Sequence, residues 1–227
     1  MVKPMKPMKP MKPMKPLLRN RLSHLGVLPT IDLVRRLPAT GRWVAGGCAG
    51  VAPPPVKRIV LSAYLRRFDI KQFIETGTFL GDTLAYIARN KSVHCNSIEL
   101  ADEYFNDAAE RFERWQNVNV LHGDSGMLLP KLVQELKQPA LFWLDGHYSG
   151  GSTAQGDLDT PIRVELRAIF DSPIKSHVIL IDDVRNFDGT NGYPFLDELL
   201  AEVRMNSDYN IEISADIARL TPRQLAF

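Results

Sequence analysis

Cysteine is scarce in this chain, which has two in 227 residues. Cys48 and Cys95 lie far apart and form no Cys-x-x-Cys pair, which argues against a disulfide framework and a thiolate zinc site. Apolar runs of about 18 residues are also missing, and no apolar segment follows the basic N-terminus, so neither a membrane span nor a secretory signal is predicted. These absences favour a reducing, cytoplasmic setting.

The folded part of the chain also lacks an excess of positive charge. The formal net charge is +2, but five of the 28 basic residues are lysines within the first sixteen positions. Without these lysines, 23 basic residues stand against 26 acidic ones, a net charge of −3. A mildly acidic domain argues against a broad nucleic-acid-binding surface, and no nucleic-acid partner is expected.

The N-terminal region divides into a repetitive tail and an irregular connector. Residues 1–16 hold the triplet Met-Lys-Pro four times, which predicts a solvated polyproline II or disordered tail. Two interpretations of this tail are open: a dispensable extension, or a contact to acidic partners or an anionic membrane. Residues 17–55, with a short helix expected at 30–37, are predicted to cap the following domain or to cover the acceptor.

Residues 56–227 alternate short apolar strands with helical stretches, which predicts one α/β domain. The expected fold is a Rossmann-like doubly wound sheet, mostly parallel with a C-terminal antiparallel strand and with helices on both faces. Strands are expected at 72–75, 94–99, 118–122, 141–145, 178–182, 209–214 and 217–220, with a turn at Ala215-Asp216. Helices are expected at 56–67, 82–90, 102–115, 127–136, 161–170 and 194–205.

Two of these helices carry specific predictions. In the helix at 56–67, Ile59, Val60, Ala63 and Tyr64 form the stripe expected to pack on the sheet. Thr160 is expected to cap the helix that follows it, and Pro161 suits the first turn of that helix.

Acidic residues end almost every predicted parallel strand. They are Glu75, Glu99, Asp145 and the pair Asp182-Asp183, and Asp124 follows the third strand by two residues. Because ligands of open parallel sheets bind at the carboxyl ends of the strands, these side chains are the first candidates for function.

The first strand runs into a loop with glycine at Gly77 and Gly81. A dinucleotide site would need a further glycine for the pyrophosphate, but Thr78 and Phe79 occupy that space. S-adenosylmethionine (SAM), which has no pyrophosphate and whose cationic side can face a carboxylate, fits this loop better. The residues expected to bind it here are Glu75, Thr76, Gly77, Gly81 and Thr83.

Glu99 and Asp124 extend the predicted cofactor site. Glu99 lies 22 residues beyond Gly77, the spacing at which a carboxylate accepts hydrogen bonds from both ribose hydroxyls; the alternative is a solvated side chain or a helix cap. Asp124 and Ser125 follow the third strand within reach of an adenine amino group. An N-cap role for Asp124 is compatible with that binding.

The fourth and fifth strands bring three carboxylates together. Asp145, Asp182 and Asp183 would repel one another unless protons or a cation intervene, and hard oxygen ligands favour Mg²⁺, Mn²⁺ or Ca²⁺. A divalent metal on these three residues is therefore predicted. The alternative is that one Asp caps a loop while another orders Arg185, with no metal.

His147 lies two residues beyond Asp145 and can titrate near neutral pH. With Asp145 it is predicted to be catalytic, His147 removing the proton of an acceptor hydroxyl during methyl transfer; the alternative is a solvated loop histidine. The glycine-rich segment from Ser149 to Gly156 is either a closing lid or a connector.

From about Val56 to Phe227 the chain resembles class I SAM-dependent methyltransferases. Within them it is most similar to the metal-dependent O-methyltransferases of the macrocin type, which act on sugar hydroxyls. The resemblance rests on Glu75-x-Gly77 with Gly81, Glu99, Gly123-Asp124, Leu144-Asp145-Gly146 and Ile181-Asp182-Asp183. It implies cofactor contacts at the first three and Mg²⁺ ligands at Asp145, Asp182 and Asp183. The chain departs from that family in carrying His147 where an acid is typical, and in the length of residues 146–156.

The expected function is methyl transfer from SAM to a hydroxyl of a sugar or other small polar acceptor, with a divalent metal. A metal-independent SAM methyltransferase, a nicotinamide-dependent oxidoreductase and a non-enzymatic adaptor that binds through its lysine tail are the alternatives. The sequence leaves open whether the chain forms a homo-oligomer.

Overall fold

The computed structural model describes residues 28–146, 160–190, 192–205 and 208–223. It contains a seven-stranded sheet with the order β3-β2-β1-β4-β5-β7-β6. The strands are β1 (Gln72–Thr76), β2 (His94–Glu99), β3 (Val118–His122), β4 (Ala140–Leu144), β5 (Val178–Ile181), β6 (Tyr209–Ser214) and β7 (Ile217–Pro222). The first five pair in parallel, and β7 pairs antiparallel with both β5 and β6. This confirms the predicted fold class.

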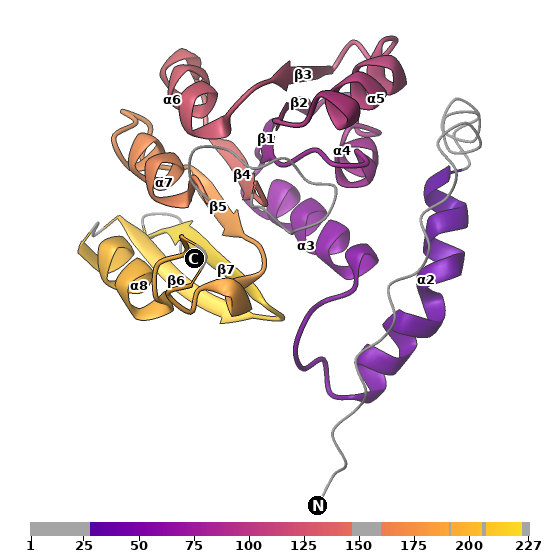
Figure 1. The fold of residues 1–227 in the computed structure, drawn as a ribbon, viewed down its shortest axis with the longest axis horizontal. Coiled ribbons are helices and arrows are strands. Elements are labelled where there is room, and N and C mark those ends of the chain that lie inside the picture. The colour runs from indigo at the N-terminus through magenta and orange to yellow at the C-terminus, as the bar shows by residue number, and fades with distance from the viewer. Residues whose placement is uncertain (1–27, 147–159, 191, 206–207, 224–227) are drawn as a thin grey trace, which may run out of the picture.

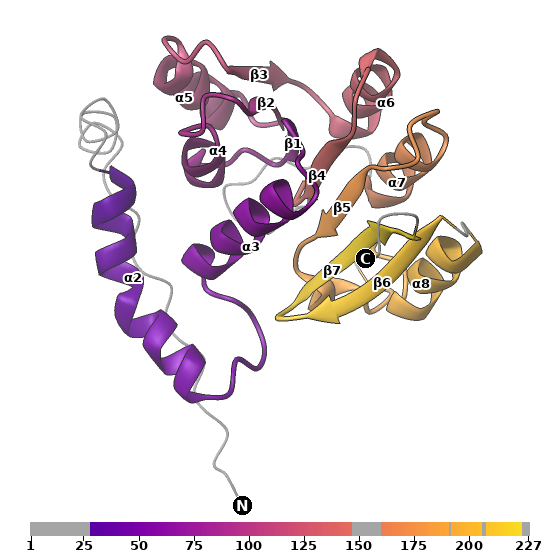
Figure 2. The same ribbon diagram turned by 180° about the vertical axis from the view of Figure 1, so that it is seen from behind.

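Helices cover both faces of the sheet (Figures 1 and 2). On one face, α3 (Pro54–Arg67), α4 (Asp82–Ile87) and α5 (Asp102–Phe112) pack on the side chains of Phe73, Cys95, Leu141 and Trp143. On the other face, α6 (Ser125–Glu135), α7 (Ile162–Phe170) and α8 (Leu196–Met205) pack on Ile74, Ile98, Phe142 and Ile179. All five residues of β4 are buried, as a central parallel strand between two helical layers requires.

The predicted packing stripe of α3 is half right, because Val60 and Tyr64 are partly buried against the core. Ile59 is 54% exposed and Ala63 is also exposed, whereas Leu61 and Leu65 are buried in the core. The sheet selects the face that carries these two leucines and Arg58, so the apolar residues at Ile59 and Ala63 are left toward solvent.

Element ends differ from prediction by a few residues. Helix α2 (Leu28–Ala45) is longer than the stretch predicted at 30–37, and α4 ends at Ile87 rather than at 90. The short strand-to-strand turn is as predicted: Ala215 and Asp216 both have positive φ, as a tight antiparallel hairpin demands. Helix α7 begins at Ile162, with Pro161 rather than Thr160 at its N-cap position, although the Thr160 hydroxyl accepts a hydrogen bond from the amide of Ile162 at 3.3 Å.

The strand order has a switch point between β1 and β4. Connections after β1 lead outward to β2 and β3, and the chain then returns through α6 to β4 on the other side of β1. At such a switch point the loops of neighbouring strands diverge, which leaves room for a ligand at the carboxyl ends. Within the described ranges, no helix is both long and apolar enough to cross a membrane.

Candidate functional site

The predicted acidic residues lie along one edge of the sheet. The parallel registers place the ends of β3, β2, β1, β4 and β5 side by side, so Asp124, Glu99, Glu75, Asp145 and Asp182 follow one another along that edge. The prediction that they share an edge is therefore confirmed. His147 and the segment from Ser149 to Gly156 lie outside the described residues, as does the tail at 1–16.

Gly77 brings the first loop against the neighbouring strand. Its φ is +82°, and a Cβ atom added to it would lie 2.5 Å from the carbonyl oxygen of Asp145. Its amide donates to the carbonyl of Ile98 at 2.9 Å. Glycine is required here both by the left-handed backbone and by the close approach of β4 to β1.

Glu75 is buried beneath this loop, with an exposed fraction of 2%. The hydroxyl of Ser97 donates to its Oε2 at 2.8 Å, and Thr78 Oγ1 lies 2.6 Å from the same hydroxyl oxygen. Burial raises the pKa of Glu75 to about 8, although the Ser97 hydrogen bond opposes this change. The carboxyl group is therefore largely neutral at pH 7 and would ionise when a cation approaches it.

Glu99 joins the tip of β2 to the glycine loop. Its Oε2 accepts from the amide of Phe79 at 2.7 Å and its Oε1 from the amide of Ala101 at 2.9 Å. Each carboxylate oxygen has two lone pairs, so each can accept a second hydrogen bond. Two adjacent oxygens of this kind match the two hydroxyls of a ribose.

Phe79 itself has a positive φ of 48°, which is rare for a bulky residue. Its ring packs edge-on against Tyr104 with centroids 4.7 Å apart, while 46% of the residue stays exposed. A strained, exposed aromatic residue beside the acidic residues at the strand ends is typical of a binding site.

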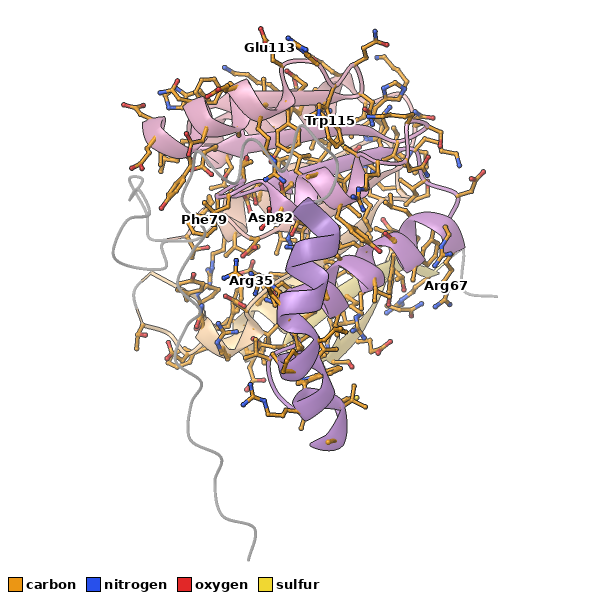
Figure 3. All side chains as sticks on the ribbon, turned by 90° about the vertical axis from the view of Figure 1, so that its right-hand side faces the viewer. Arg35, Arg67, Phe79, Asp82, Glu113 and Trp115 are labelled. Carbon is orange, nitrogen blue, oxygen red and sulfur yellow. The ribbon has the colours of Figure 1, made fainter. Side chains whose placement is uncertain are left out.

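A buried ion-pair network supports the loop from behind. Asp82, at the start of α4, lies 3.1 Å from Arg111 Nη1 and 3.7 Å from Arg58 Nη2. Arg111 also donates to the carbonyl of Leu80. These contacts fix the backbone between Gly77 and α4. Helix α2 contacts α4, the helix that begins at Asp82; Phe79 and Asp82 are labelled in Figure 3.

Asp124 and Ser125 lie at the start of α6, as predicted. The Asp124 side chain accepts from the amide of Gly126 at 2.7 Å, which makes it the N-cap of that helix. Ser125 is buried and faces Glu165 of α7. Burial raises the pKa of Glu165 to about 7, although the hydroxyls of Ser125 and Thr76 oppose this change. Among the predicted cofactor residues, Thr76 therefore faces α7, and Thr83 lies half-buried in the first turn of α4.

A cavity lies between the ends of β4 and β5 and helix α7. Glu165 of α7 and Asp182 at the end of β5 both line this cavity. Its lining includes Leu144, Gly146, Thr160, Ile162, Glu165, Asp182 and Tyr193.

The three aspartates at β4 and β5 form one cluster. Asp145, Asp182 and Asp183 each offer a carboxylate oxygen, and these oxygens lie within 4.8 Å of one another. Asp182 is buried, with an exposed fraction of 4%, and Asp183 has a left-handed backbone at φ 53°. The sequence correctly predicted this convergence.

A lysine that the sequence analysis missed lies in the same cluster. Lys57 Nζ is 2.5 Å from Asp182 Oδ2 and 3.1 Å from Asp183 Oδ1. Burial opposes its charge, but Asp182, Asp183 and Asp145 outweigh that effect and raise the pKa of Lys57. Arg185 in turn contacts Asp183 at 2.8 Å and pairs with Asp216. The contact between Arg185 and Asp183 is the one that the metal-free alternative expected.

The oxygen donors of the cluster suit a divalent metal, but their present partners do not. Two carboxylate oxygens bind Lys57, and Asp182 Oδ1 accepts the amide of Asp183 at 2.9 Å. Mg²⁺ requires about six oxygen ligands at close to 2.1 Å, which an ammonium group among the carboxylates prevents. With Lys57 among the carboxylates, the arrangement therefore does not fit the divalent metal that the sequence predicted.

A topological signal could have revealed Lys57. Helix α3 runs antiparallel to the strand that follows it, so the first turn of α3 lies at the carboxyl edge of the sheet. Lys57 lies on that first turn, two positions after Pro53-Pro54-Pro55, and Arg58 follows it. By contrast, nothing local in the sequence marks Ser97 or Glu165, whose partners lie on other strands and helices.

Comparison with solved structures agrees with this topology. The SAM-bound O-methyltransferase TomG from Streptomyces achromogenes has a TM-score of 0.56 at 16% identity, covering 93% of this chain and 91% of that one. The SAH-bound methyltransferase PaMTH1 from Podospora anserina has a TM-score of 0.55 at 14% identity, covering 95% and 100%. An O-methyltransferase from Bacillus cereus in complex with SAH gives 0.55 at 14% identity, covering 90% and 97%.

The chain has the Rossmann-like methyltransferase fold. No family model matches the chain, and no curated protein matches it significantly. At these identities the likeness establishes the methyltransferase fold alone.

Proposed function

We propose that this protein transfers a methyl group from SAM to a hydroxyl group of a small polar acceptor, such as a sugar. The proposal rests on the residues at the carboxyl ends of the neighbouring strands β1 and β2. There the tight turn at Gly77, the buried Glu75 and the two-oxygen face of Glu99 converge at the switch point of the sheet. Solved structures with this fold include O-methyltransferases bound to SAM or SAH, which supports the same cofactor here.

The chemistry of the residues present suits SAM. Glu99 would accept the ribose hydroxyls, and Glu75 would ionise toward the cationic end, because an adjacent positive charge favours the carboxylate. Asp124 and Ser125 would lie toward the adenine. When bound, SAM supplies an electrophilic methyl group on a sulfonium. A pyrophosphate cofactor fits less well, since Phe79 occupies the loop position that would have to be glycine.

The acceptor is proposed to bind at the end of β4, next to the donor. Asp145, half-buried and one residue beyond that strand, would orient the acceptor hydroxyl through a hydrogen bond. His147, placed there by sequence alone, would accept the hydroxyl proton as the methyl group transfers. Helix α2 contacts α3 and α4, whose first turns carry Lys57 and Asp82, and we propose that residues 17–55 cap this edge.

Calorimetric titration of the purified protein with SAM and, separately, with NAD tests the proposal. Saturable SAM binding without NAD binding is expected. Saturable binding of NAD with none of SAM would favour the oxidoreductase instead. A screen of hydroxyl acceptors, followed by the release of SAH, then defines the acceptor class.

Substituting Glu99 with glutamine is expected to weaken SAM binding by about tenfold, because charge-assisted hydrogen bonds to a ribose contribute about 1.5 kcal/mol or more. The measurement is the SAM dissociation constant from calorimetry. The matched control is Glu103→Gln, an exposed residue on the first turn of α5, which should bind SAM like the wild type. Equal affinity of the Glu99 variant and the wild type would contradict the ribose role.

A further inference from the structure

The acidic cluster at the ends of β4 and β5 already contains a positive charge from elsewhere in the chain. Lys57 lies 125 residues before Asp182 in sequence, and its ammonium nitrogen contacts both Asp182 and Asp183. Its side chain is 14% exposed and that of Asp182 is 3% exposed. An ion pair held in so little solvent is screened weakly, so it dominates the local electrostatics.

The other cation at the cluster cannot replace Lys57. Arg185 contacts Asp183 from the outer side, with its side chain 46% exposed, and also pairs with Asp216 of the β6–β7 turn. Within the described ranges, the cation that contacts the buried Asp182 is Lys57. Without it, Asp182 would be a buried carboxylate beside two further acids, an arrangement that requires a proton or another cation.

The position of Lys57 is fixed by the fold. The three prolines that precede it pre-set the backbone for the first turn of α3, and Pro54 and Pro55 occupy the first helical positions. Arg58 on the next position is buried against Asp82, and Leu61 one turn later is buried in the core. The lysine is thus held on a rigid helix turn that faces the strand ends.

We infer that Lys57 supplies the positive charge that the Asp145, Asp182 and Asp183 cluster requires, in the position where a divalent metal would otherwise bind. Resting on the proposed function, the corollary is that methyl transfer by this protein needs no divalent metal. Lys57 acts here as a fixed counter-ion that holds Asp182 and Asp183 in place and offsets the negative charge of Asp145 beside the acceptor. It is therefore a positioning residue, and it donates hydrogen bonds to Asp182 and Asp183.

Binding of Mn²⁺ alone, followed by electron paramagnetic resonance, tests the inference without any assay of activity. The wild-type protein is expected to leave millimolar Mn²⁺ free in solution. Lys57→Met, which keeps a long side chain but removes the charge, is expected to bind one Mn²⁺. Adding Asp182→Asn to that variant should abolish the binding, because it removes the buried ligand.

Two control variants separate the inference from general effects of charge removal. Arg185→Met keeps Lys57 in the cluster and should bind no Mn²⁺, although it too removes one positive charge beside Asp183. Lys71→Met removes an exposed lysine that pairs with Asp69 and should also bind none. Circular dichroism of each variant reports whether the fold is retained.

The inference would be overturned if the wild-type protein bound Mn²⁺ and the Asp182→Asn variant did not. This comparison needs no Lys57 variant. A folded Lys57→Met protein that binds no Mn²⁺ would overturn it as well. Failure of the proposed function appears separately, as the absence of SAM binding in calorimetry. Once an acceptor is known, SAH release that stops after dialysis against a chelator and returns with Mg²⁺ would also contradict the corollary.

Discussion

Replacing Gly77 with alanine is expected to abolish SAM binding within the range of calorimetry, a loss of at least about 100-fold or about 2.7 kcal/mol. The added Cβ would lie 2.5 Å from the carbonyl oxygen of Asp145 on a backbone with φ +82°. Because the obstructing atom belongs to the backbone of the neighbouring strand end, no side-chain rotation relieves the clash. The turn must move away from β4, and the loop that carries Phe79 moves with it.

Gly47→Ala is the matched control for this variant. Gly47 has a similar φ of +77°, but a Cβ added there meets no atom within 4 Å. It should therefore lower stability by about 1 kcal/mol through backbone strain and leave SAM affinity unchanged. If Gly77→Ala bound SAM as tightly as Gly47→Ala does, the turn at Gly77 would not be part of the donor site.

At alkaline pH, the Glu75→Gln variant is expected to have a higher free energy of unfolding than the wild type. The upper bound of the difference is about 5 kcal/mol. The pKa of Glu75 is about 8 in the folded protein, against an ordinary value of 4.5, because the carboxyl group is buried. The folded state therefore keeps a proton that the unfolded state releases. The stability from this group is complete below pH 4.5 and is lost as pH rises to about 8.

Glutamine cannot ionise and can still accept the hydrogen bond from Ser97, so the variant lacks this loss. Urea unfolding of both proteins between about pH 5 and 9 gives a difference curve in which other titrating groups cancel. Glu165→Gln serves as comparison, because the pKa of Glu165 is about 7 and its difference curve should level off earlier. Parallel stability curves for wild type and Glu75→Gln would show that Glu75 is ionised in the folded protein.

The strands could be predicted closely because each is a short apolar run between turn residues, and a central parallel strand needs little else. Helix ends were less predictable. Helix α4 stops at Ile87 because the side-chain amide of Asn117 donates to the carbonyls of Ala88 and Val93, which stabilises a non-helical turn there. Asn117 lies in the segment before β3, and no sequence pattern near Ile87 predicts its contact with this turn.

The packing of α3 shows a second limit of local pattern. Periodicity predicted a stripe of Ile59, Val60, Ala63 and Tyr64, of which Val60 and Tyr64 do pack on the core. The most deeply buried residues are instead Leu61 and Leu65, on the face that also carries Arg58, and Arg58 reaches Asp82 at the start of α4. Local periodicity does not distinguish overlapping apolar faces of a helix, because packing on the sheet and on α4 decides which residues are buried.

The sequence by itself determined the order of strands and helices, the glycine at the first turn and the acids at the strand ends, since these depend on residues close together in the chain. Tertiary structure alone decided that Lys57 lies among the aspartates and that Glu75 holds its proton near neutral pH. The reason is physical: the charge state of a buried group depends on solvent exclusion and on neighbours brought from distant segments. Such neighbours exist only once the sheet and its helices have packed.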